Sequence, residues 1–184
     1  MVANLRYHRA MGKSVSALQN RLHQAALLYL GRYEASVQSL RRLLQRRIER
    51  WARLEQWEID EPALQAVEAV IARLRALQAV DDARFAESKA RALFRGGRSG
   101  RAIQAYLAAR GIDTETAGLA LAHRAGEGEE DPDLTAALLL ARKRRLGRFR
   151  PEEARAVHRA RDLAALGRAG FSWEVARRVV DEEN

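Results

Sequence analysis

The chain has 184 residues, and its 33 lysines and arginines against 24 acids give a formal net charge of +9 at pH 7. It has no cysteine, which excludes disulfides and thiolate metal sites. The charge favours a polyanionic partner or an acidic protein surface, because such a field steers association and holds phosphates. Nearly all the cations are arginines, whose planar fork suits bidentate binding of phosphate or carboxylate, although a genomic bias toward arginine and alanine codons also explains the ratio.

Residues 1–15 are expected to form a flexible N-terminal tail. They lack the apolar core of a signal peptide, and the apolar run at residues 25–30 is too short to span a bilayer. We therefore expect a cytoplasmic protein that has no membrane partner.

The first helical repeat is predicted over residues 16–80. Only three prolines occur in a chain rich in alanine, leucine and arginine, which indicates helices throughout. Helices are expected over residues 16–30 and 36–57, and Asp60-Glu61-Pro62 opens a third. In this third helix four apolar residues are spaced to share one buried face: Leu64, Val67, Ile71 and Leu74.

A pattern of leucine, four residues and an apolar residue recurs at three helix junctions, which are Leu43–Ile48, Leu107–Ile112 and Leu166–Phe171. In the last two a capping residue follows at once, Asp113 or Ser172, with an acid in the first helical turn. In the first unit the capped start is displaced, as though residues near 48–58 had been inserted.

The second repeat is predicted over residues 81–125 and the third over residues 134–184. Between them, residues 126–133 are rich in acids, glycine and proline and are expected to form an acidic linker. Each unit is predicted to contain two helices followed by a third helix that has an N-cap residue. The predicted fold class is therefore all-α, with tandem three-helix repeats. Stacked together, the repeats bury apolar surface that no single repeat can bury alone.

Two adjacent acids, Asp81 and Asp82, precede a basic helical segment. A metal site is disfavoured, because adjacent helical residues point about 100° apart and no third carboxylate lies at a suitable spacing. A helix cap fits better, since either carboxylate can accept the unpaired N–H groups of the following helix and suit its dipole. In that helix Phe85 is expected to face the core, and Arg84 the solvent.

Three clusters of arginine are the candidate contacts to a partner. A solvated helix face explains any single cluster, but three clusters in separate units favour an extended electropositive surface. The candidate contact residues are Arg42, Arg46, Arg50, Arg95, Arg98, Arg101, Arg144, Arg145 and Arg148.

No arrangement of residues in the sequence indicates catalysis. The histidines are scattered without metal-ligand spacing, and no glycine-rich phosphate loop follows a strand. The segment Gly96–Gly100, GGRSG, lacks the Walker spacing and is interpreted as a structural turn rather than a phosphate cradle. We expect no enzymatic activity, no cofactor and no metal.

The segment DDARFAESKARALFRGGRSGRAIQAYLAARGID, which starts at Asp81, resembles the central signature of the RecX regulatory proteins. The ending LGRAGFSWEVARRVV and the segment YLGRYEASVQSLRRLLQRR are similar to the third and first repeats of that family. The resemblance implies an elongated, curved array of three-helix repeats that lies in the groove of the RecA recombinase filament on DNA. It also implies inhibition of ATP hydrolysis, strand exchange and co-protease activity, and some affinity for DNA.

We expect a monomer that acts on the recombinase filament. The alternative is a helical DNA-binding protein that acts independently of a recombinase. Against sequence-specific DNA binding, no helix shows a compact reading face of Asn, Gln and Arg, and the charge is spread over all units. Whether binding saturates with the recombinase or with the DNA distinguishes the two hypotheses.

Overall fold

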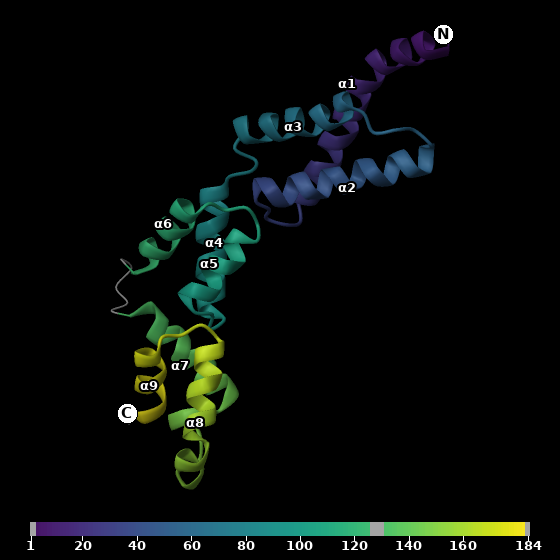
Figure 1. Ribbon diagram of the computed structural model, residues 1–184. Coiled ribbons are helices and arrows are strands. Elements are labelled where there is room, and N and C mark those ends of the chain that lie inside the picture. Colours follow the sequence, from purple (N-terminus) through teal and green to yellow (C-terminus); the bar gives the residue numbers. More distant parts are fainter. Residues whose placement is uncertain (1–2, 126–130, 183–184) are drawn as a thin grey trace. The chain divides into compact units, whose positions relative to one another are not determined.

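The structure is a computed structural model that describes the backbone of residues 3–125 and 131–182, with side chains at residues 15–122 and 131–182. All regular structure in these ranges is helical (Figure 1). The chain divides into two compact units, residues 1–82 and residues 83–184, and the helix α4 (Asp82–Arg95) starts at the boundary. We call them unit 1 and unit 2.

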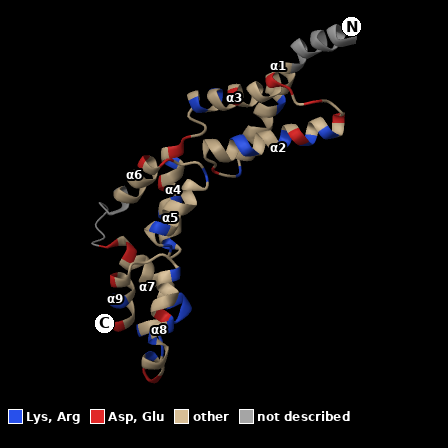
Figure 2. Ribbon diagram, in the orientation of Figure 1, with Lys and Arg blue, Asp and Glu red and all other residues tan. Residues whose placement is uncertain are grey.

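Unit 1 contains three mutually packed helices, α1 (Ala3–Leu30), α2 (Val37–Glu55) and α3 (Glu61–Ala76). The α2 helix begins after Ser36, whose Oγ accepts the N–H of Ser39 at 3.1 Å, and ends at Gln56 in the left-handed region. The core takes apolar residues from all three helices, including Leu22, Leu44 and Leu74. The outward side of α2 carries charged residues, which Figure 2 shows in blue and red.

The α3 helix starts as predicted, since Asp60 accepts the N–H of Ala63 at 3.0 Å and Pro62 lies in the first turn. Three of the four apolar residues assigned to its inner face are buried, but Leu64 is 43% exposed. In α3 the alanines Ala63 and Ala66 point inward beside Val67, and this rotates Leu64 to the rim of the buried stripe.

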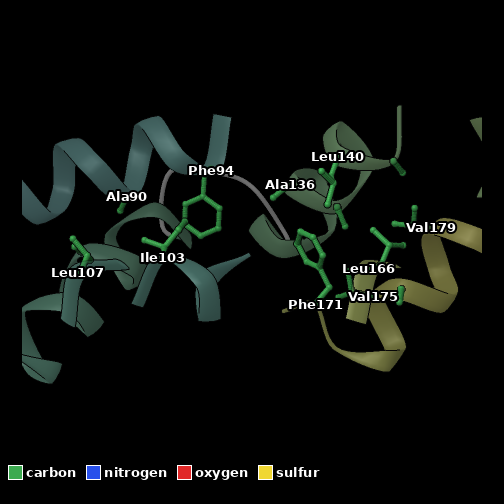
Figure 3. Close-up of a cluster of buried hydrophobic side chains, with 14 of the residues drawn as sticks. Ala90, Phe94, Ile103, Leu107, Ala136, Leu140, Leu166, Phe171, Val175 and Val179 are labelled. Carbon is green, nitrogen blue, oxygen red and sulfur yellow. The ribbon is translucent and has the colours of Figure 1, made fainter. Parts of the chain in front are cut away.

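Unit 2 contains the rest of α4 and the helices α5 (Gly100–Ala108), α6 (Thr114–Ala125), α7 (Pro132–Arg144), α8 (Glu152–Arg168) and α9 (Trp173–Asp181), with a 3₁₀ turn, η1 (Gly147–Phe149). The predicted second and third repeats share one hydrophobic core. Figure 3 shows Phe94 and Ile103 on one side of it, and Leu140, Leu166 and Phe171 on the other. The two three-helix groups of unit 2 are therefore not independently packed.

Three predicted segments differ from the structure. The α1 helix begins at Ala3, so residues 3–15 are helical rather than a tail; the segment contains no proline and is rich in helix-forming residues. Of the predicted insertion near residues 48–58, the part up to Glu55 lengthens α2. Of the acidic linker 126–133, residues 126–130 lie outside the described residues, whereas Asp131 caps α7 and residues 132–133 belong to its first turn.

Gly97 lies where the turn between α4 and α5 passes close to α7. Its φ of +79° is in the left-handed region, and a Cβ there would lie 3.1 Å from the backbone nitrogen of Leu140. A larger residue would be strained and would push the turn away from α7. The interpretation of GGRSG as a structural turn is consistent with this geometry.

Two aspartates cap helices other than their own. Asp82 Oδ1 accepts the N–H of Val37, the first residue of α2, at 2.8 Å. In unit 2, Asp133 Oδ1 accepts the N–H of Gly100, the first residue of α5, at 2.7 Å. The sequence predicts that Asp81 or Asp82 caps the helix that follows; Asp82 does act as a cap, but of α2, because the N–H that it accepts lies 45 residues away and no local spacing reveals it.

Candidate functional site: a cationic cleft in unit 2

The candidate contacts in unit 1 lie along one side of α2. Arg42, Arg46 and Arg50 are four residues apart and are all exposed. Their neighbour Arg41 is engaged, since its Nε lies 2.7 Å from Glu68 Oε1 on α3. The hydrogen bonds of this pair raise the pKa of Arg41 and lower the pKa of Glu68. We call Arg42, Arg46 and Arg50 the α2 arginine edge.

The candidate contacts in unit 2 surround the turns that end α4 and α7. Five are exposed, which are Arg95, Arg98, Arg101, Arg144 and Arg145. Arg148 is different, because it is partly buried and donates to the carbonyls of Arg178 and Val179 at 2.8 and 3.3 Å. It satisfies carbonyls near the C-terminal end of α9, so its guanidinium has a structural task that the sequence did not indicate.

A cleft with a volume of about 600 Å³ lies between the two three-helix groups of unit 2. Its walls come from the α4–α5 turn, from the end of α7 and from the last turns of α8. We call it the cationic cleft, since four of its lining residues carry positive charge: Arg98, Lys143, Arg144 and Arg168. The remaining lining residues are Gly96, Gly97, Ala102, Leu140, Ala165 and Ala169. None of the lining residues is acidic. Figure 2 shows blue segments on both α5 and α8.

The four cations of the cleft contrast with other arginines of the chain. Arg41, Arg150 and Arg159 each lie within 2.7 Å of a carboxylate oxygen. Within the described part of the chain, by contrast, none of the four cleft cations forms an ion pair or a side-chain hydrogen bond. Their donors are therefore available to an anionic ligand.

Asp162 anchors the connection between α7 and α8. It is fully buried, and it accepts two hydrogen bonds from Arg150, at 2.6 and 2.9 Å, and one from the N–H of Gly147 at 2.8 Å. Burial alone would raise the pKa of Asp162, but the hydrogen bonds from Arg150 and Gly147 outweigh it and hold that pKa below its ordinary value. The ion pair fixes η1 and thereby the path from α7 into α8.

The signature residues have mainly structural positions. Phe85 is buried in the core of unit 2, and Arg84 is exposed. Asp113 accepts the N–H and the hydroxyl of Thr116, each at 2.8 Å, and these bonds lower the pKa of Asp113. Ser172 accepts the N–H of Val175 at 3.2 Å. The caps at Asp113 and Ser172 are confirmed, and Asp81 lies half-buried immediately before α4.

Sequence reasoning missed two cations of the cleft. Lys143 lies next to the candidate contact Arg144 but was not among the predicted contacts, and Arg168 lies far in sequence from all of them. Both are in the last turn of a helix, where a cation is a common complement to the dipole and so carries no specific signal. Only the packing of α7 and α8 against the α4–α5 turn brings them together with Arg98.

The described residues offer neither a metal site nor a membrane span. They contain no group of three or more His, Asp or Glu side chains that could hold a metal ion. No described helix is both long enough and apolar enough to cross a bilayer.

Comparison with known proteins identifies relatives that are named RecX. The family model for the second three-helix domain of RecX matches residues 81–121, which contain α4, α5 and most of α6. The regulatory protein RecX of Myxococcus xanthus (strain DK1622) is 41% identical over 161 residues, which are 87% of this chain and 84% of that protein. The regulatory protein RecX of Agrobacterium fabrum (strain C58 / ATCC 33970) is 36% identical over 104 residues, 56% of this chain and 53% of that protein.

Two solved structures have a similar fold. A crystal structure of regulatory protein RecX matches 96% of this chain and 78% of its own, with a TM-score of 0.68. A crystal structure of RecX from Lactobacillus salivarius matches 90% of this chain and 96% of its own, with a TM-score of 0.64. Both are 20% identical to this chain, so the likeness concerns the all-helical fold.

Proposed function

The chain belongs to the RecX family of regulatory proteins, and from this premise we propose that it binds the RecA recombinase filament on DNA and inhibits it. The activities that it inhibits are ATP hydrolysis, strand exchange and co-protease cleavage. By limiting co-protease cleavage, the protein restrains the SOS response. It acts as a monomer in the cytoplasm, where the recombinase works.

The observation that carries the proposal is the presence of exposed arginine clusters in both units. A filament on DNA offers phosphates and acidic side chains over a long surface, and arginine forks bind both bidentately. The net charge of +9 steers the chain toward such a surface.

Inhibition in this scheme needs binding and no catalysis. A regulator that binds one state of the filament more tightly shifts the population toward that state, by as much as the two affinities differ. ATP turnover requires the filament subunits to change state, so a regulator that favours one state slows turnover. The regulator needs neither a cofactor nor a nucleophile for this effect.

The alternative is a helical protein that binds DNA independently of a recombinase. The cationic cleft favours it, because an unpaired set of cations binds phosphates with no recombinase present. The two functions differ in what limits binding, which is the recombinase in the first and the DNA in the second.

The test is the ATP turnover of recombinase filaments preformed on single-stranded DNA. The chain should inhibit turnover at well below one molecule per recombinase subunit, and should hydrolyse no ATP itself. The triple variant R42A/R46A/R50A should inhibit less strongly at an unchanged melting temperature, and the matched variant R42K/R46K/R50K should keep most of the inhibition. Unchanged turnover at saturating wild-type chain would contradict the proposal.

A further inference from the structure

We propose that the cationic cleft of unit 2 is a binding site for the phosphodiester backbone of nucleic acid, which it binds without regard to base sequence. This inference rests on the proposed function, in that it names the ligand of one part of the regulator's surface. It assigns direct nucleic-acid binding to Arg98, Lys143, Arg144 and Arg168, and leaves the α2 arginine edge for the recombinase.

The charge of the cleft is the first argument. Four cations from three segments line one hollow, and no acid lies among them. Like charges around one cleft repel one another, and this repulsion is relieved when an anion enters. Elsewhere in the chain, arginines such as Arg150 and Arg159 have a carboxylate partner within the protein. The cleft therefore lacks its counter-charge, and a ligand can supply it.

The hydrogen-bonding chemistry of the lining is the second argument. Its charged side chains offer only donors, so the ligand must present acceptors. The phosphate oxygens of a nucleic acid are such acceptors, and they recur along the strand. The lining has no Asn, Gln, Asp or Glu that could read a base edge, and no aromatic ring on which a base could stack. Binding should therefore depend on the backbone and not on the sequence.

The uncharged lining residues favour a nucleic-acid backbone over an acidic protein. Cores of protein–protein interfaces are rich in aromatic side chains, whereas protein–DNA interfaces are more polar and more positive. The cleft has glycine, alanine and one leucine between its cations.

The experiment measures the affinity of the full chain for fluorescein-labelled oligothymidylate by anisotropy, over a range of salt concentrations and with no recombinase. The cleft variant is R98A/K143A/R144A/R168A. The slope of log affinity against log salt should become shallower by about 0.7 for each phosphate that the variant no longer neutralises, up to about 3 for four phosphates. Affinity at low salt should fall accordingly.

A matched variant, R46A/R47A/R50A/R53A, removes the same charge from exposed positions of α2 in unit 1. It should keep nearly the wild-type slope. Equal losses in the two variants would mean that DNA responds only to net charge, and would overturn the proposal. In the cleft variant, the salt slope for oligouridylate should fall by the same amount as the salt slope for oligothymidylate. A fall for only one of the two oligonucleotides would contradict backbone binding. The triple lysine variant R98K/R144K/R168K should restore most of the slope, and the melting temperature of each variant checks its fold.

The outcome is separable from that of the proposed function, because this titration contains no recombinase. A cleft variant that keeps its DNA affinity but no longer binds recombinase in the absence of DNA would assign the cleft to an acidic protein surface, and the proposal would fail. A wild-type chain that binds oligothymidylate through the cleft but leaves recombinase ATP turnover unchanged would overturn the proposed function and leave the cleft assignment standing.

Discussion

Asp82 and Asp133 lie in different helices and have the same structural role. Each accepts the first N–H of a helix whose N-cap is a fully buried serine, Ser36 in unit 1 and Ser99 in unit 2. A helix start leaves several N–H groups without an intrahelical partner, and a negative charge is favourable there. Serine and aspartate together satisfy two of these donors at each start.

Replacing Asp82 tests this role. Asp82→Asn should cost less than about 1 kcal/mol, because the amide oxygen still accepts the N–H of Val37 and only the charge near the helix dipole is removed. Asp82→Ala should cost about 1–2 kcal/mol, since that partly buried N–H then has no acceptor. Denaturant unfolding measures both. Glu87→Ala removes an exposed acid from the same helix and should change stability by less than about 0.5 kcal/mol. A destabilisation of the Asn variant equal to that of the Ala variant would refute the cap.

Asp162 gives stability that depends on pH. Because its pKa in the folded state lies below the value in the unfolded chain, it contributes fully above about pH 4 and loses the contribution as the pH falls toward the folded pKa. Asp162→Asn should destabilise by about 2–3 kcal/mol near neutral pH, below the usual cost of breaking a buried pair because the Arg150 side chain keeps 21% exposure.

Urea unfolding of both proteins from pH 7 to pH 3 measures this effect. The difference in unfolding free energy between wild type and Asp162→Asn should shrink toward the acidic end. A difference that stays constant over the range would show that the carboxylate charge is not what stabilises η1.

At the scale of helices, most of the fold could be predicted from the sequence. Periodicity and caps are local properties, so the starts of α3, α6 and α9 follow from Asp60, Asp113 and Ser172. Side-chain faces follow less reliably, as Leu64 shows, because alanine can fill a tight helix contact in place of a larger residue. Extension of α1 to Ala3 had no local signal beyond the absence of proline and the helix-forming residues of this segment, which also contains Gly12.

Two leucines of α3 test the corrected helix face. Leu74→Ala should destabilise the protein by about 2–5 kcal/mol, since Leu74 is fully buried in the core of unit 1. Leu64→Ala should cost about 0.5 kcal/mol or less, since that side chain is 43% exposed. Thermal or denaturant unfolding of the two variants compares them directly. Similar costs would place both leucines in the core, as the periodicity alone predicts.

At the scale of the whole molecule, the contacts that make the candidate site are long-range. Arg98 and Arg168 are separated by 70 positions and share the cleft only because the two three-helix groups of unit 2 form one core. Periodicity within a helix carries no information about such a contact. For the same reason the sequence predicts the three-helix groups but not that the second and third of them share one hydrophobic core. The elongated, curved array stays a prediction, which small-angle scattering checks.

The central claim is that the recombinase filament is the target, and co-sedimentation tests it most directly. Filaments are formed at a fixed recombinase concentration on increasing amounts of single-stranded DNA, and the pelleted chain is measured at saturation, with naked DNA in parallel. We predict that filaments bind more of the chain than the same amount of naked DNA does, and that this excess follows the recombinase and stays constant once the DNA exceeds what the recombinase can cover. An amount that rises with the DNA, and that is the same with and without recombinase, would contradict the account and identify an independent DNA-binding protein.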